Sequence, residues 1–130
     1  MRFMIVEDEY WQRRTLRRFL DTIEETVLVG EFEDAGSAWS FFNDNADTVD
    51  IAIVDLVLPD YSGICLAEQM KERKPGLKLL CISGEDNINA LREGIFIAKP
   101  FRLDKFTKAI ELIKNNQERS LADKTAIIEY

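Results

Sequence analysis

Short apolar runs alternate along the chain with segments of helical periodicity, and this alternation limits the possible folds more than any other feature. The apolar runs cover residues 2–6, 27–32, 50–55, 77–83 and 94–98. Between the first two runs, apolar residues recur with the i, i+3, i+4, i+7 spacing of a helix: Leu16, Phe19, Leu20 and Ile23. Regular alternation of strands and helices predicts an α/β domain in which helices cover both faces of a parallel sheet.

A helix is expected after each of the other strands as well. Ser37 is a candidate N-cap for the second helix. The third spans about residues 63–73 and is ended by a Pro-Gly pair. The fourth, in the segment 85–93, contains few apolar residues and should be unusually short, and the last follows Pro100. The chain is therefore expected to form a doubly wound (βα)5 domain.

Composition excludes several classes of function. The length of 130 residues suits one domain, and the net charge of −7 argues against a nucleic-acid-binding surface. The chain has no histidine, which rules out Ser-His-Asp and Cys-His catalysis, histidine metal ligands and a phosphohistidine carrier. No apolar run has the length of a membrane span, and the start "MRFMIVEDE" lacks the layout of a signal peptide, so we expect a cytoplasmic protein. Cys65 and Cys81 stand apart in apolar surroundings, which predicts two buried free thiols.

The predicted strands end in residues that carry a charge, a hydroxyl group or no side chain. In strand order these are Glu7 and Asp8, then Asp55, then Ser83 and Gly84, then Lys99. The carboxyl ends of parallel strands meet at one edge, where doubly wound folds place their ligands. If the first and third strands are neighbours, three carboxylates converge and need a counter-charge.

These residue types suit phosphoryl transfer. An all-oxygen cluster without histidine or cysteine favours a hard cation, most simply Mg²⁺. Lys99 adds a positive charge and Ser83 a hydroxyl donor, and Gly84 lets a ligand approach the backbone closely. A carboxylate nucleophile, a metal, a lysine and a hydroxyl together predict the transfer of a phosphoryl group to an aspartate.

Four motifs in register carry a family resemblance: "IVEDE", "IVDLVLPDYSG", "CISGE" and "IAKPF". With them, about residues 2–118 resemble the receiver domain of two-component response regulators. The resemblance implies a flavodoxin-like fold with five parallel strands in the order 2-1-3-4-5. It also implies a receiver domain over 1–118, with 119–130 as a C-terminal extension or the start of a linker.

The resemblance assigns a role to each matching residue. Asp55 is the phosphoacceptor, and Mg²⁺ is held by Glu7, Asp8, Asp55 and the backbone carbonyl of Val57. The phosphoryl group is contacted by Ser83, Gly84 and Lys99, the switch residues are Ser83 and Phe96, and the bond before Pro100 is cis. The implied phosphodonor is a sensor histidine kinase or a histidine phosphotransfer protein. A downstream output domain or protein is implied too, whereas turnover as an enzyme and direct contact with nucleic acid or a membrane are not.

The chain also departs from the family pattern. Glu7 and Ser83 replace the commoner aspartate and threonine. Fifteen residues separate Ser83 from Lys99, several fewer than usual, and the shortfall falls on the predicted helix over 85–93. Because that face often transmits the signal in the family, a phosphorylation-independent interaction module is the alternative function. A haloacid-dehalogenase-type phosphatase is disfavoured because Val57 stands where it needs a second aspartate, and a flavodoxin-like electron carrier because "EDEYW" would repel phosphate.

Several residues have a simpler structural interpretation. Asp50 opens the third strand, so we expect it at the opposite edge of the sheet and merely solvated. Asp60 is assigned to the turn opened by Pro59. Phe96 could fill the core instead of switching. The arginines of the first helix form either a solvated face or a docking surface for an acidic partner, and they are Arg13, Arg14, Arg17 and Arg18.

Overall fold

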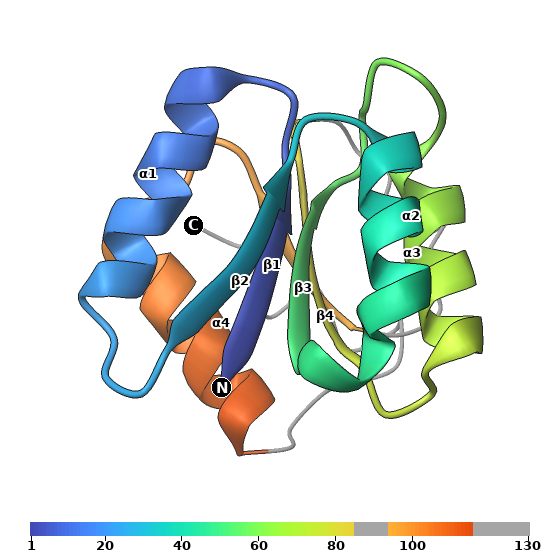
Figure 1. Cartoon of the computed structure of the whole chain (residues 1–130). Coiled ribbons are helices and arrows are strands. Elements are labelled where there is room, and N and C mark those ends of the chain that lie inside the picture. The colour runs from blue at the N-terminus through green and yellow to red at the C-terminus, as the bar shows by residue number, and fades with distance from the viewer. Residues whose placement is uncertain (85–93, 116–130) are drawn as a thin grey trace.

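The computed structural model describes residues 1–84 and 94–115, and these residues form a parallel sheet between two pairs of helices (Figure 1). The strands are β1 (Arg2–Val6), β2 (Val27–Phe32), β3 (Ile51–Asp55), β4 (Lys78–Ser83) and β5 (Ile95–Ala98). The helices are α1 (Tyr10–Asp21), α2 (Ala35–Asn45), the 3-10 turn η1 (Ala46–Thr48), α3 (Gly63–Arg73) and α4 (Leu103–Lys114). The strand order is β2-β1-β3-β4-β5, which confirms the predicted order 2-1-3-4-5.

Two predictions lie outside the described residues: the short helix over 85–93 and the extension over 119–130. Within the part of the chain that is described, no helix has both the length and the apolar character needed to cross a membrane.

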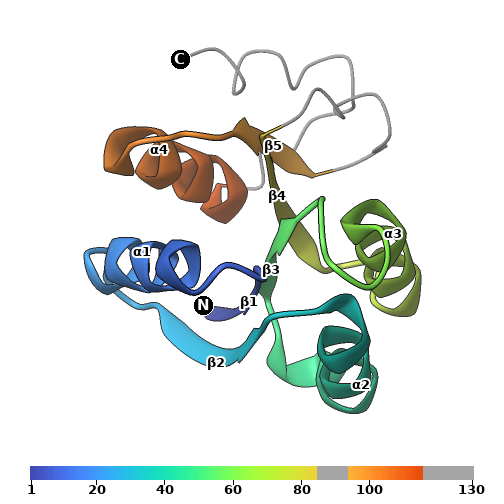
Figure 2. The same ribbon diagram turned by 90° about the horizontal axis from the view of Figure 1, so that it is seen from above.

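The sheet has α1 and α4 on one face and α2 and α3 on the other (Figure 2), and it divides the core into two clusters of buried side chains. Side chains on a strand alternate between its faces. On β3, Ile51 and Ile53 pack on the side of α1 and α4, while Ala52 and Val54 pack on the side of α2 and α3. Burial on both faces explains why this strand reads as a continuous apolar run in the sequence.

The start of α2 corrects one prediction and adds to another. Its N-cap is Asp34, not Ser37: the Asp34 carboxylate accepts a hydrogen bond from the Ser37 backbone N–H at 2.7 Å. Asp60 is also bound to this helix, since its carboxylate accepts from the N–H groups of Ala35 at 2.9 Å and Gly36 at 2.8 Å. These backbone hydrogen bonds, first that from Ala35, lower the pKa of Asp60. Asp60 therefore ties the β3–α3 loop to α2 instead of only shaping its own turn.

The prediction of two buried thiols is wrong for one of them. Neither cysteine forms a disulfide bond, but Cys65 is exposed and Cys81 is buried. Cys65 lies on the outer side of α3, because the next two residues, Leu66 and Ala67, are the ones that face the sheet. The apolar neighbours of Cys65 in the sequence thus reflect the opposite side of the helix.

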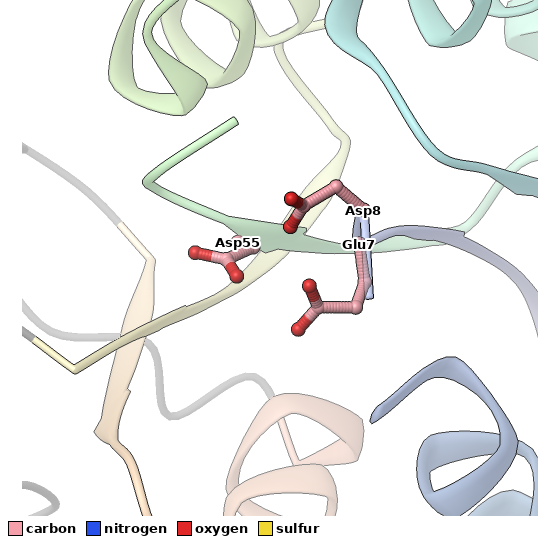
Figure 3. A group of neighbouring side chains, drawn as sticks. All are labelled: Glu7, Asp8 and Asp55. Atoms are coloured by element: carbon pink, nitrogen blue, oxygen red, sulfur yellow. The ribbon is translucent and has the colours of Figure 1, made fainter. Parts of the chain in front are cut away.

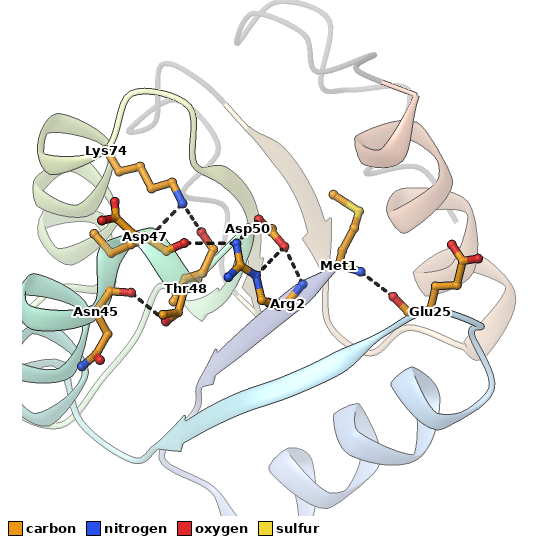
Figure 4. Close-up of polar contacts among 10 residues, drawn as sticks. Met1, Arg2, Glu25, Asn45, Asp47, Thr48, Asp50 and Lys74 are labelled. Carbon is orange, nitrogen blue, oxygen red and sulfur yellow. Dashed lines mark hydrogen bonds and ion pairs between the residues drawn. The ribbon is translucent and has the colours of Figure 1, made fainter.

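The amino edge of the sheet, where the strands begin, is closed by polar contacts (Figure 4). As expected, Asp50 lies here, directly before β3. It is more than solvated, however: its carboxylate accepts from the Arg2 backbone N–H at 2.7 Å and from the Arg2 guanidinium at 3.2 Å. The hydrogen bonds from Arg2 lower the pKa of Asp50. One carboxylate is thus matched by one guanidinium.

Candidate functional site

The acidic residues predicted to form a site meet at the carboxyl edge of the sheet (Figure 3). Strands β1 and β3 are paired, with Val6 opposite Val54, so the residues that follow them are neighbours. Carboxylate oxygens of Glu7, Asp8 and Asp55 lie within 4.8 Å of one another. The Glu7 and Asp55 side chains are buried, whereas Asp8 is exposed.

Lys99 provides the counter-charge for this cluster. Its ammonium nitrogen lies 2.8 Å from Glu7 Oε1 and 2.7 Å from Asp55 Oδ2, so it bridges the two buried carboxylates. Burial disfavours the charge of Lys99, but the hydrogen bonds to Asp55 and Glu7 outweigh burial and raise its pKa. For Glu7 burial is the larger effect: it raises the pKa of that carboxyl to about 7 in spite of the Lys99 hydrogen bond. Within the part of the chain that the structure describes, the site therefore holds more carboxylates than cations.

The other oxygen of each buried carboxylate is oriented by the backbone. Glu7 Oε2 accepts from the Glu9 N–H at 3.1 Å, and Asp55 Oδ1 accepts from the Val57 N–H at 2.9 Å. A carboxylate oxygen has more than one lone pair, so these bonds leave room for a further ligand. Three convergent carboxylates, one of them open to solvent, fit a hard cation that keeps several waters, such as Mg²⁺.

The remaining predicted residues lie on β4 and β5. Ser83 is buried, and its carbonyl accepts from the Lys99 N–H at 2.8 Å, which brings the two strand ends together. Gly84 is exposed, and a side chain placed there would meet nothing within 4 Å. Phe96 is buried in the cluster on the side of α2 and α3, so it fills the core in this structure. The Lys99–Pro100 bond is cis, as the resemblance implies.

Sequence reasoning missed the importance of Gly63. A Cβ atom at this position would lie 2.1 Å from the Asp55 carbonyl oxygen and 2.7 Å from the Leu56 Cα, closer than any real contact. The Gly63 N–H donates to the Leu56 carbonyl at 3.1 Å and closes the loop. The signal was the glycine that ends the "DYSG" turn after Asp55, where the start of α3 folds back against the end of β3.

The arginines of α1 do not form one uniform face. Arg13 is folded back onto the chain, and its guanidinium donates to the backbone carbonyls of Glu7 at 2.8 Å and Asp8 at 3.3 Å. Arg17, by contrast, is half exposed and makes an ion pair with Glu31 at 3.4 Å. A docking role for this helix stays a prediction, but Arg13 belongs to the site.

Comparison with known proteins agrees with this geometry. The family model described as "Response regulator receiver domain" matches residues 3–111. The chain is 31% identical over 111 residues to the transcriptional regulatory protein PhoP of Escherichia coli (strain K12), covering 81% of this chain and 48% of PhoP. It is 29% identical over 133 residues to protein MrkE of Klebsiella pneumoniae, covering 94% of this chain and 48% of MrkE. The chain thus spans about half the length of these curated relatives.

Solved structures show the same fold. The response regulatory domain of MrkE from Klebsiella pneumoniae superposes with a TM-score of 0.78 at 20% identity, over 89% of this chain and 97% of that one. The isolated REC domain of RcsB from Salmonella enterica serovar Typhimurium, determined with the phosphomimetic BeF3⁻, has a TM-score of 0.79 at 21% identity, over 99% of each chain. At these identities the likeness establishes the fold alone.

Proposed function

The chain belongs to the response regulator receiver family, and on that basis we propose that it accepts a phosphoryl group on Asp55 and thereby switches a two-component signalling output. The observation that carries the proposal is the buried Asp55 carboxylate, held by Lys99 at 2.7 Å beside two further carboxylates at the carboxyl edge of the sheet. The phosphodonor in this proposal is a phosphohistidine of a sensor histidine kinase or of a histidine phosphotransfer protein.

In the proposed transfer, an Asp55 carboxylate oxygen bonds to phosphorus as the donor's P–N bond breaks, and the electron pair leaves with the imidazole nitrogen. In this proposal Mg²⁺ would be held by Glu7, Asp8, Asp55 and the Val57 carbonyl. When bound, this ion offsets negative charge on the phosphoryl oxygens. Lys99 adds its own charge, already placed between the carboxylates. The Ser83 hydroxyl and the Gly84 backbone complete the set of phosphoryl contacts.

The proposed switch follows from the change of charge at Asp55. A phosphoryl group adds about two negative charges and several acceptor oxygens. Lys99, which two carboxylates share before the transfer, then pairs with the more strongly charged phosphoryl group. The Ser83 hydroxyl turns toward the same phosphoryl group. The inward movement of this hydroxyl shifts the loop after β4 and vacates space, which Phe96 on the neighbouring strand β5 enters. These differential contacts are what shift a conformational equilibrium.

Further parts of the proposal concern the whole protein. Residues 1–118 act as the receiver, 119–130 as an extension or the start of a linker, and the signal passes to an output domain or protein. The greater length of the curated relatives supports such an output. The protein works in the cytoplasm, assists its own phosphorylation without turning over a substrate, and does not contact nucleic acid or membrane through this domain.

Intact-mass measurement tests the proposal. With Mg²⁺ and acetyl phosphate, the protein should gain one phosphoryl group that hydroxylamine removes, as expected for an acyl phosphate. Asp55→Asn should abolish the gain, and Asp50→Asn, at the other end of the same strand, should retain it. Equal phosphorylation of Asp55→Asn and wild type would contradict the assignment. Absence of phosphorylation in wild type with any donor would favour the phosphorylation-independent interaction module.

A further inference from the structure

We propose that Arg13 is a positioning residue for the acidic pair of the site. Its guanidinium holds the backbone after β1 so that the Glu7 and Asp8 carboxylates face Asp55. The inference rests on the proposed function, because it concerns the Mg²⁺ affinity of these same carboxylates.

The first support is the placement of the Arg13 side chain. It starts in the first turns of α1, where its backbone N–H donates to the Glu9 carbonyl at 3.0 Å, and it reaches back past the helix start. There one terminal nitrogen meets both the Glu7 carbonyl, at 2.8 Å, and the Asp8 carbonyl, at 3.3 Å. Only 15% of the side chain is exposed, in contrast to an arginine on a solvated helix face.

The second support is that Arg13 binds the backbone directly after β1, where the hydrogen bonds of the sheet end. The Glu7 N–H still donates to the Phe32 carbonyl at 2.9 Å, so β2 orients the backbone up to this point. The Glu7 carbonyl is in turn held by the hydrogen bond from Arg13. Both carbonyls that Arg13 contacts belong to residues whose carboxylates form the acidic cluster. A small rotation of this backbone would turn the carboxylates away from Asp55.

The guanidinium is itself held in place. The Glu33 carboxylate lies 3.9 Å from its nitrogen, and the Tyr10 ring centroid lies 5.8 Å from its central carbon. The Arg13 Nη1 atom carries two N–H groups in the fixed plane of the guanidinium, so it can donate to both carbonyls, and the same nitrogen is the one near Glu33. A lysine ammonium keeps the charge but lacks this planar geometry.

The positive charge of Arg13 and its positioning role predict opposite changes in Mg²⁺ affinity when the residue is replaced. A cation near the site repels Mg²⁺, so removing a purely electrostatic arginine should tighten metal binding. Removing a positioning arginine should weaken it. Arg14 is the matched control, because it is the next residue on the same helix and its guanidinium donates to the Tyr10 hydroxyl at 3.2 Å, away from the Glu7–Asp8 backbone.

The experiment is a Mg²⁺ titration of the 130-residue wild-type chain and of Arg13→Met, Arg13→Lys and Arg14→Met, followed by the backbone amide NMR signals of the folded protein. Arg13→Met should raise the Kd for Mg²⁺ about tenfold, the low end for loss of a residue that orients metal ligands. Arg13→Lys should lie between Arg13→Met and wild type, and Arg14→Met should bind as tightly as wild type or more tightly. A merely structural role would lower stability and leave the Kd of the folded molecules unchanged.

The outcomes separate the two proposals. If wild type binds Mg²⁺ and both Arg13 variants have an unchanged or lower Kd, the positioning role is overturned and the metal site stands. Absence of saturable binding in wild type overturns the metal site and the positioning role together. Should Arg13→Met not fold, the rise in Kd expected for Arg13→Lys, which keeps the charge and most of the stem, decides the matter alone.

Discussion

Strand β3 is flanked by an aspartate at each end, and the two edges of the sheet treat these carboxylates differently. At the amino edge, Asp50 is bound by one guanidinium, that of Arg2, and a third of its side chain is exposed. At the carboxyl edge, the nearly buried Asp55 shares the single ammonium of Lys99 with a second buried carboxylate. In these contacts among the described residues, one carboxylate is paired with one guanidinium at the first edge, whereas the acidic cluster at the second edge has more carboxylates than bonded cations.

The difference between the two edges is reflected in the pKa values of their carboxyls. At the amino edge the pKa of the carboxyl is lowered, because Arg2 satisfies the ionised form. At the carboxyl edge burial raises the pKa of Glu7 to about 7, because one lysine does not compensate for the loss of water around two carboxylates. The excess charge costs stability, and a bound cation relieves it, which is why such a cluster points to ligand binding.

The largest expected effect comes from the same substitution at one glycine of each edge. Gly63→Ala places a Cβ 2.1 Å from the Asp55 carbonyl oxygen, so the backbone must move, and we expect the free energy of unfolding to fall by about 3 kcal/mol or more. Gly76 precedes β4 at the amino edge, and a Cβ there meets nothing within 4 Å. Gly76→Ala should therefore change stability by less than about 0.5 kcal/mol. Urea unfolding followed by tryptophan fluorescence measures both, and equal losses would contradict the described loop.

The next effect concerns the two cations. Lys99→Met leaves buried carboxylates without their bonded ammonium and should lower the free energy of unfolding by about 3 kcal/mol in the absence of divalent ions. Arg2→Met, at the exposed edge, should cost much less. Millimolar Mg²⁺ should recover part of the loss in Lys99→Met and none of it in Arg2→Met. A loss in Arg2→Met as large as that in Lys99→Met would remove the distinction between the edges.

The two carboxyls should give pH dependences of opposite sign. Because the folded-state pKa of Glu7 is raised from 4.5 to about 7, its contribution to stability is complete below pH 4.5 and is lost as the pH rises through 7. Wild type without Mg²⁺ should thus lose roughly 1–3 kcal/mol between pH 5 and 8. Glu7→Gln, which keeps a neutral side chain of similar shape, should flatten this decline. A decline of the same size in Glu7→Gln would assign it to another group.

The smallest effect is expected at Asp50. Its folded-state pKa is lowered below 3.8, so its contribution is present above that value and is lost as the pH falls through the folded-state pKa. Asp50→Asn should reduce the loss of stability on acidification below pH 4 and leave the interval from 5 to 8 unchanged. Thermal unfolding over this pH series measures both variants, and an Asp50→Asn curve altered above pH 5 would contradict the assignment.

Local patterns predicted most of the fold, and long-range contacts account for what they missed. The five strands follow from the apolar runs, whereas their order was implied by the family resemblance and is confirmed by the structure. The N-cap of α2 was misassigned because Asp34 and Ser37, three residues apart, are both good cap residues, and only the backbone conformation separates them. Asp60 and Arg13 form hydrogen bonds with backbone groups that the local sequence pattern does not predict as their partners. Asp60 accepts from a helix start 25 residues earlier, and Arg13 donates to the backbone that precedes its own helix.

The sequence by itself determined which residues stand at the strand ends, because burial of apolar side chains on both faces of a sheet leaves a readable pattern. Only the tertiary structure decided how these residues meet. Glu7 and Asp55 become neighbours through the pairing of β1 with β3, and Lys99 reaches both from β5. Burial and a shared counter-charge then set the pKa of Glu7. Such energies depend on distances of a few ångströms between segments far apart in the chain, and a residue pattern along one segment does not encode them.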